Sequence, residues 1–186
     1  GKWMNIWWSP EYVHMAQARV ALALARIGQG DAGFNALVYG WQSDLSLTGK
    51  AELMETIALT TGKDRRTDGL LQDLESAIHV EATAARIVEP DSNRWLAFWD
   101  GDAAPSAATL SALMAAYPDH PLADRLAIGL AESRSSARWT NTYTTIRAFG
   151  ALSAFAAYRE QGAPATGAHG MLGGKPLFEA IFNGPK

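Results

Sequence analysis

The sequence contains no cysteine, and this absence excludes several kinds of chemistry from the chain. Without a thiol, the chain forms no disulfide bond, has no thiolate nucleophile and offers no cysteine ligand to a metal. The absence is compatible with the cytoplasm and with the periplasm, so it does not decide between these compartments.

The chain also lacks a concentration of positive charge. It has 16 lysines and arginines against 19 aspartates and glutamates, which gives a formal net charge of −3. No basic cluster is long enough to follow a phosphate backbone. We therefore expect no nucleic acid among its partners.

Long apolar runs are absent as well. The segment 1–8 carries one charge and has no apolar core of the length that a signal peptide needs. The most apolar stretch, 137–158, is too short to span a bilayer and is interrupted by Arg147. Because the chain begins Gly-Lys-Trp and ends Asn-Gly-Pro-Lys, we expect it to be a piece of a longer protein.

What the sequence does contain is typical of a folded, helical domain. Of its 186 residues, 48% are hydrophobic and 19% charged, which is enough for a sizeable core. Apolar residues recur at helical spacing, and Ser9, Gly28 and Gly62 are typical helix-start and helix-stop residues. On the first helix, the residues Val13, Ala16, Val20, Leu24 and Ile27 follow helical spacing. Helices are predicted over 10–27, 31–40, 47–61, from Asp64 or Thr67 to Ile78, 106–117 and 121–133.

A further helix, within Ala137–Tyr158, is predicted to be the centre of the fold. Thr140 or Asn141 can cap its start, and the residues that follow are apolar on every side. A helix that is apolar all round is usually buried, so we expect it to lie inside a ring of other helices. Helix pairs that recur without a fixed period favour an all-α fold of the α/α-toroid type.

Two stretches break the helical pattern. Residues 80–102, with Trp95 and Trp99, are predicted to be an irregular crossing or an extended segment with an exposed acidic turn. Residues 161–170 are predicted to be a linker, followed by a turn at Gly173–Gly174 and a β-strand at Leu177–Phe182. A single strand needs a partner, so we expect a helical domain over 1–160 and, over 161–186, a linker and strand that lead to a following β-domain.

Few residues are candidates for chemistry. His79 and Glu81, with Glu75 nearby, could act in acid–base catalysis or bind a metal, but no third ligand has a suitable spacing. We favour a surface or helix-end pair for them. His14 is interpreted as a packed residue and Asp119, before Pro121, as a helix cap.

An acidic loop, which contains Glu89, Asp91, Asp100 and Asp102, is the other candidate. We favour a solvated loop over a site, because its spacing does not fit a calcium loop. Gly170, Gly173 and Gly174 precede a strand and not a helix, so they form no phosphate loop. No catalytic, cofactor-binding or metal-binding residue is assigned.

Three segments together resemble the bacterial α2-macroglobulins. They are 12–31 (YVHMAQARVALALARIGQGD), 45–76 and 106–158. The last carries the resemblance most strongly, with a Pro-Asp-His-Pro-Leu turn at 118–122, then Arg138-Trp139, Asn141-Thr142 and a long Ala/Leu helix. Tyr143 stands where the family usually has glutamine, which is a departure from its pattern.

The resemblance implies the later part of a thioester-type domain, which is a terpenoid-cyclase-like α/α toroid followed by a β-sandwich. Such proteins are large, periplasmic and often lipid-anchored to the inner membrane. They are broad-spectrum protease inhibitors that cage a protease after it cuts a bait region. Many of them carry a Cys-x-x-Gln thioester, which is absent from this sequence, so we transfer no thioester residue.

On this resemblance we expect a non-enzymatic fragment of a protease trap that needs no cofactor. Its partners would be proteases, through the parent protein, and neighbouring domains of the same polypeptide. Only the parent would be anchored to a membrane. Two alternatives stay open: an α/α-toroid enzyme of cyclase or glycosidase type, which would use Asp100, Asp102 and Glu81, and a helical scaffold that binds peptides.

Overall fold

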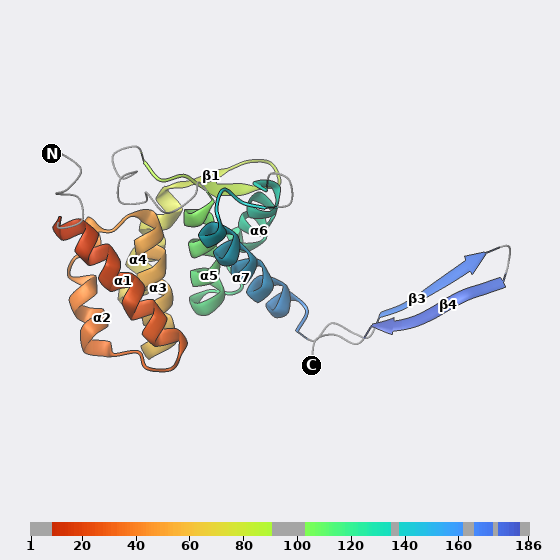
Figure 1. Ribbon diagram of the computed structural model, residues 1–186, viewed down its shortest axis with the longest axis horizontal. Coiled ribbons are helices and arrows are strands. Elements are labelled where there is room, and N and C mark those ends of the chain that lie inside the picture. Colours follow the sequence, from red (N-terminus) through yellow and green to blue (C-terminus); the bar gives the residue numbers. More distant parts are fainter. Residues whose placement is uncertain (1–8, 91–102, 135–137, 162–165, 173–174, 183–186) are drawn as a thin grey trace.

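The computed structural model describes residues 9–90, 103–134, 138–161, 166–172 and 175–182. Within these ranges the chain is mostly helical, as predicted for an all-α fold, and two short β-hairpins complete it (Figure 1). The helices are α1 Pro10–Arg26, α2 Ala32–Tyr39, the 3-10 helix η2 Gln42–Asp44, α3 Leu47–Thr61, α4 Arg65–Ser76, α5 Ala104–Ala116, α6 Leu122–Glu132 and α7 Thr142–Arg159.

Local sequence signals set most of the helix ends. The Ser9 hydroxyl accepts a hydrogen bond from the backbone N–H of Tyr12 at 3.3 Å, as an N-cap does. Asp64 and Thr67 form a capping box at the start of α4. Gly62, with φ of 80°, ends α3 in a conformation that glycine adopts without steric penalty. These starts and stops confirm the predicted helices to within a few residues.

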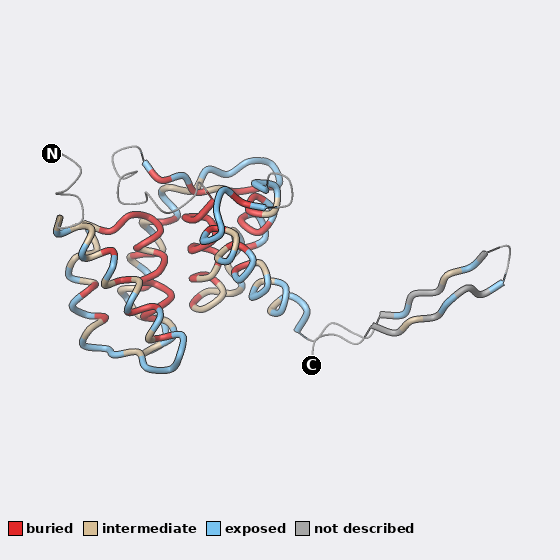
Figure 2. Tube along the Cα trace, viewed as in Figure 1, coloured by how far each residue is buried: buried red, intermediate tan, exposed pale blue. Residues whose placement is uncertain are grey.

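The centre of the fold is formed by α3 and α5. They pack against each other, with α1 and α4 also against α3, and α6 and α7 against α5. Figure 2 shows the buried residues concentrated along these two helices. Both are buried around most of their circumference, because other elements cover them on several sides. Leu53, Met54, Ile57, Leu110 and Leu113 are each 1% exposed or less.

The expectation that the helix within Ala137–Tyr158 lies at the centre is wrong. Its structural counterpart, α7, buries only Thr144, Ala148 and Ala151, whereas Ile146 and Phe149 are 66% and 69% exposed. The apolar composition of α7 therefore reflects one face packed on α5 and a second apolar face that is open in this chain.

The apolar residues whose spacing indicates the first helix do not form its buried face. Val13, Val20 and Ile27 are exposed, and α1 instead buries Met15, Ala18, Ala21, Leu22 and Ala25 against its neighbours. Both faces of α1 are apolar, so periodicity alone could not tell them apart. The small side chains of the buried face allow α1 to approach α3 closely.

Part of the predicted irregular crossing forms a hairpin. Strand β1 (Ile78–Val80) pairs antiparallel with β2 (Ala85–Ile87), so α4 ends before Ile78 and not at it. The backbone N–H of Ile87 donates to the Ser106 hydroxyl at 2.9 Å, which ties the hairpin to α5. Trp95 and Trp99 lie outside the described residues.

The C-terminal strand has a partner within the chain, contrary to expectation. Strand β3 (Thr166–Leu172) pairs antiparallel with β4 (Lys175–Phe182), so part of the predicted linker is a strand. The small residues of β3 suit a linker, but hydrogen bonding to β4 holds them extended. A Cβ atom at Gly170 would lie 2.3 Å from the Phe178 ring. The hairpin projects away from the helices (Figure 1).

Two helical glycines differ in their surroundings, and this difference makes a prediction. A Cβ atom at Gly129 would lie 2.2 Å from the Ala85 carbonyl oxygen, whereas one at Gly150 would meet nothing within 4 Å. We expect Gly129→Ala to lower the free energy of unfolding by about 1–3 kcal/mol through steric strain. Gly150→Ala should raise it by about 0.5–1 kcal/mol, since alanine favours the helix.

Urea denaturation followed by circular dichroism measures both changes in the same chain. Each variant is the control of the other, because the chemical change is identical and only the surroundings differ. Changes of the same sign would contradict this account of α6 packing against β2.

Candidate functional site

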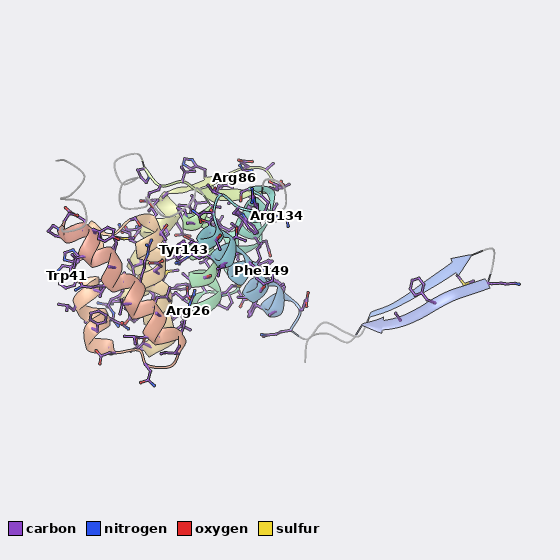
Figure 3. The ribbon with its side chains drawn as sticks, in the orientation of Figure 1. Arg26, Trp41, Arg86, Arg134, Tyr143 and Phe149 are labelled. Carbon is purple, nitrogen blue, oxygen red and sulfur yellow. The ribbon has the colours of Figure 1, made fainter. Side chains whose placement is uncertain are left out.

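One described candidate for a site is a cleft of about 400 Å³ that four helices share. Arg19 of α1 lies 5.5 Å from the ring centroid of Tyr143 of α7, so these two helices flank the same face of α3. Figure 3 shows Tyr143, Arg26 and Phe149 on the α1 and α7 side of the fold. The lining residues are Arg26 (α1), Glu55 and Leu59 (α3), Ser111, Met114 and Ala115 (α5), and Ile146, Arg147, Gly150 and Ala154 (α7).

Glu52 is the most deeply buried charge beside this cleft. It lies in the middle of α3 and its side chain is 0% exposed. Arg147 Nη1 donates to Glu52 Oε1 at 2.5 Å, and the same nitrogen donates to the Tyr143 hydroxyl oxygen at 2.5 Å. Arg19 Nε lies 3.6 Å from Glu52 Oε2. One buried carboxylate therefore connects α1, α3 and α7.

Glu55, on the next turn of α3, binds a third arginine, Arg26. Arg26 Nε donates to Glu55 Oε1 at 2.8 Å and Nη2 donates to Oε2 at 3.0 Å, which is a bidentate pair. Burial raises the pKa of Glu55 above its usual value of 4.5, although Arg26 acts in the opposite direction. We call Arg19, Arg26, Glu52, Glu55 and Arg147 the concave charge cluster.

The geometry of the concave charge cluster suits a structural role better than a catalytic one. Both oxygens of Glu55 accept hydrogen bonds from one guanidinium, so neither is well placed to remove a proton from a substrate. Glu52 is fully buried behind Arg147. Among the described residues, no group of three or more His, Cys, Asp or Glu side chains could hold a metal ion.

The structure separates the histidines that the sequence suggested as candidates. His14 Nδ1 lies 2.9 Å from Asp44 Oδ2, and its ring stacks on Trp41 with centroids 4.2 Å apart, so it is a packed residue. His79 is exposed on β1. Glu75 pairs with His120, whose Nε2 lies 3.1 Å from Glu75 Oε1, and not with His79.

The acidic loop is only partly described, and one of its members is not solvated. Glu89 is 8% exposed, and its two carboxylate oxygens each accept from the backbone N–H of Leu47 at 3.0 Å, at the start of α3. The prediction of a solvated position is therefore wrong for Glu89, because the carboxylate stabilises a helix N-terminus. Glu81 is exposed at the β1–β2 turn. Asp91, Asp100 and Asp102 lie outside the described residues.

The predicted cap at Asp119 is also wrong. Asp119 Oδ1 accepts from the Tyr158 hydroxyl at 2.8 Å, which raises the pKa of Tyr158 and connects the α5–α6 turn to α7. At the start of α6, His120 takes this place: its Nδ1 accepts a hydrogen bond from the backbone N–H of Leu122 at 3.3 Å. Pro121 precedes α6 and donates no backbone hydrogen bond.

Sequence reasoning did not find the concave charge cluster. One signal was present: the stretch AELMETIAL in α3 places Glu52 and Glu55 among apolar residues, where a carboxylate needs a partner. The partner arginines lie on α1 and α7, far away in the sequence, so spacing could not identify them.

Comparison with family models, with curated protein sequences and with solved structures finds no match to this chain. Among the described helices, none has the length and apolar character needed to cross a membrane.

The Glu52–Arg147 pair makes a stability prediction. Arg147→Met should leave the Glu52 carboxylate buried with only the longer Arg19 contact, which lowers the free energy of unfolding by about 3 kcal/mol. Adding Glu52→Gln should restore part of this loss, since the buried charge is removed. The control is Arg159→Met on the same helix, whose partner Asp124 is exposed. We expect it to change stability by less than about 1 kcal/mol.

Chemical denaturation of the three variants measures these differences. An Arg147→Met loss no larger than that of Arg159→Met would contradict the buried pair, as would a double variant that is less stable than the single one.

Glu55 makes a prediction about pH. Its folded pKa is raised, so the folded chain binds a proton more readily than the unfolded chain. The contribution of this group to stability therefore increases as pH falls through the folded pKa toward 4.5, and is lost as pH rises. Glu55→Gln removes this titration. The free energy of unfolding of the natural chain, minus that of Glu55→Gln, should be larger at pH 5 than at pH 7.

Thermal and urea denaturation at a series of pH values measures this difference. A constant difference would show that Arg26 balances burial at this carboxylate, and one that becomes smaller as pH falls would show that Arg26 outweighs burial.

Proposed function

We propose that this chain is a wall segment of a bacterial α2-macroglobulin-like protease inhibitor, without catalytic activity of its own. The proposal begins from the sequence resemblance of 12–31, 45–76 and 106–158. In it, the helices are the later part of a thioester-type toroid and move as a body when the parent's bait region is cut. The parent would be a periplasmic protein that cages proteases and that a lipid anchor can hold at the inner membrane.

The observation that carries the proposal is the alternation of the helices. The described residues that line the cleft belong to the odd-numbered helices α1, α3, α5 and α7, while α2 and α4 pack against α3 and α6 packs against α5. Alternating inner and outer helices are the repeating unit of an α/α toroid. The arrangement supports a partial toroid whose concave side carries the cleft.

Two further features support a fragment that packs against other parts of a larger protein. The α7 face with Ile146 and Phe149 is exposed, as the inner surface of an incomplete toroid would be. The β3–β4 hairpin pairs with itself away from the helices, and a two-stranded hairpin is marginally stable alone. Both fit a parent in which more helices and a β-domain lie next to this chain.

The concave charge cluster favours the non-catalytic proposal over the toroid enzyme. The two carboxylates beside the cleft each bind arginine, and Glu81 lies at an exposed turn of a different element. The exposed apolar rim of the cleft favours the peptide-binding scaffold as second candidate, because apolar grooves bind helical peptides.

The test uses the parent protein and an active protease of broad specificity. After the two are mixed, we expect cleavage of a large protein substrate to stop while cleavage of a small peptide substrate continues. A caged protease still admits small molecules but excludes large ones.

The control is the parent cut beforehand by a different protease and then separated from it. Because its bait region is already cleaved, this cut parent should leave the cleavage of both substrates unchanged. If the uncut parent leaves cleavage of both substrates unchanged, or blocks both, the trap proposal is wrong for that protease.

A further inference from the structure

Helix α7 has an exposed face that carries no charge. All exposed residues in the range 142–157 are uncharged, and Ile146 and Phe149 among them are 66% and 69% exposed. Arg147, the charged residue in this range, is turned away from this face and pairs with the buried Glu52. A surface helix normally carries charged and polar residues on the side away from the core. The exposed side of α7 instead has the composition of a second packing face.

The spacing of the residues on this face is that of a coiled-coil seam. Six exposed residues follow one another along α7 and its C-cap in steps of four and three positions. This is the spacing of the a and d positions of a heptad, which form the line along which one helix packs against another. The spacing therefore indicates a helix as the covering element. The residues, which we call the α7 seam, are Thr142, Ile146, Phe149, Ser153, Ala156 and Glu160.

The α7 seam is complementary to itself when two copies run antiparallel. If Phe149 of one copy lies opposite Ser153 of the other, the same register places Ile146 opposite Ala156. Each large side chain then meets a small one, as close packing requires. The relation is also reciprocal, as a two-fold axis demands. A parallel pair would place Phe149 against Phe149 and Ser153 against Ser153, so that one layer is overfilled and another is empty.

Charge favours the same direction. Glu160 is the C-cap of α7, where the dipole of its own helix is unfavourable for a carboxylate. In the antiparallel pair, Glu160 lies opposite Thr142 of the other copy, which is the first residue of that copy's α7. The backbone N–H groups and the positive end of the dipole favour a carboxylate there. A parallel pair would bring two Glu160 carboxylates together.

The size of the contact predicts how tightly two copies associate. Helix α7 has 18 residues, so the seam is about 27 Å long. One pair of helices of this length lies at the lower end of specific interface sizes. We therefore expect a reversible dimer with a Kd of roughly 10–100 μM.

We propose that the α7 seam binds the α7 seam of a second copy of this chain, antiparallel and around a two-fold axis that passes between Phe149 and Ser153. The surface is thus an interface between copies of the chain. This inference goes beyond the proposed function and does not rest on it. The protease assay does not measure this contact, so the failure of either leaves the other standing.

Sedimentation equilibrium of the full chain tests the association. Across a concentration range of about 5–500 μM, the average mass should rise from the monomer mass of 20.0 kDa and level off at twice that value. It should level off at two copies because a two-fold contact is closed. A mass that stays at the monomer value, or one that continues to rise beyond two copies, would overturn the proposal.

A charge exchange at Ser153 tests whether the seam carries the contact. Ser153 is exposed, so Ser153→Glu and Ser153→Lys should both fold, which circular dichroism checks. Each variant alone should have a Kd at least about tenfold higher, because like charges meet near the axis. An equimolar mixture of the two should recover the dimer, since opposite charges then face each other.

Matched controls place the same charges elsewhere. Ile128→Glu and Ile128→Lys, at a 42% exposed position on α6, should leave the Kd within about twofold of that of the natural chain. Variants at Ser153 that dimerise like the natural chain would overturn the proposal. An equal loss at Ile128, or a mixture of the Ser153 variants that stays monomeric, would do the same.

Disulfide formation tests the direction, because the chain has no cysteine of its own. Thr142→Cys and Glu160→Cys are made as separate variants, mixed and oxidised, and mass spectrometry identifies the linked peptides. We expect links between positions 142 and 160 and none between like positions. In the antiparallel pair, like positions lie about 27 Å apart, whereas a disulfide spans at most about 7 Å between Cα atoms. Links between like positions would show a parallel pair and overturn the proposed arrangement.

Discussion

The buried carboxylate of Glu52 is the constraint on which the arrangement of the helices depends. A charge at 0% exposure in the middle of α3 requires a close cation, and Arg147 supplies it from α7 at 2.5 Å. Arg19 on α1 approaches the same carboxylate from the other side. Since a misplaced helix would leave this charge unpaired, the ion pairs favour one arrangement of α1 and α7 around α3.

The apolar core supplies the bulk of the stabilisation but is less selective. Leu53, Met54 and Ile57 of α3 pack with Leu110 and Leu113 of α5, and hydrophobic burial has no strong directional preference. The charge pairs therefore determine the relative positions of helices that the core alone would allow to shift. Arg26, Glu55 and Arg147 also line the cleft, so part of the cluster that positions these helices lies at its wall.

Local structure was largely predictable, whereas burial was not. Ser9, Asp64 and Gly62 mark helix ends through hydrogen bonds and backbone angles within a few residues of themselves. The expectation that α7 is buried on every side was wrong, and the apolar spacing of α1 did not mark its buried face, because both helices are apolar on more than one face. Which face is buried depends on neighbours that come from elsewhere in the sequence. The pairing of β3 with β4 was missed for a similar reason, since glycine and alanine say little about hydrogen-bonded partners.

The sequence by itself determined the all-α class, the helix boundaries and the absence of thiol chemistry, because these depend on composition and on contacts between near neighbours. Only the tertiary structure brought Arg19, Arg26 and Arg147 to Glu52 and Glu55. The hydrogen-bonded pairs Arg26–Glu55 and Arg147–Glu52 are separated by 29 and 95 positions along the chain. Coulombic attraction acts through space and not along the chain, so a sequence shows the charges but not which of them meet.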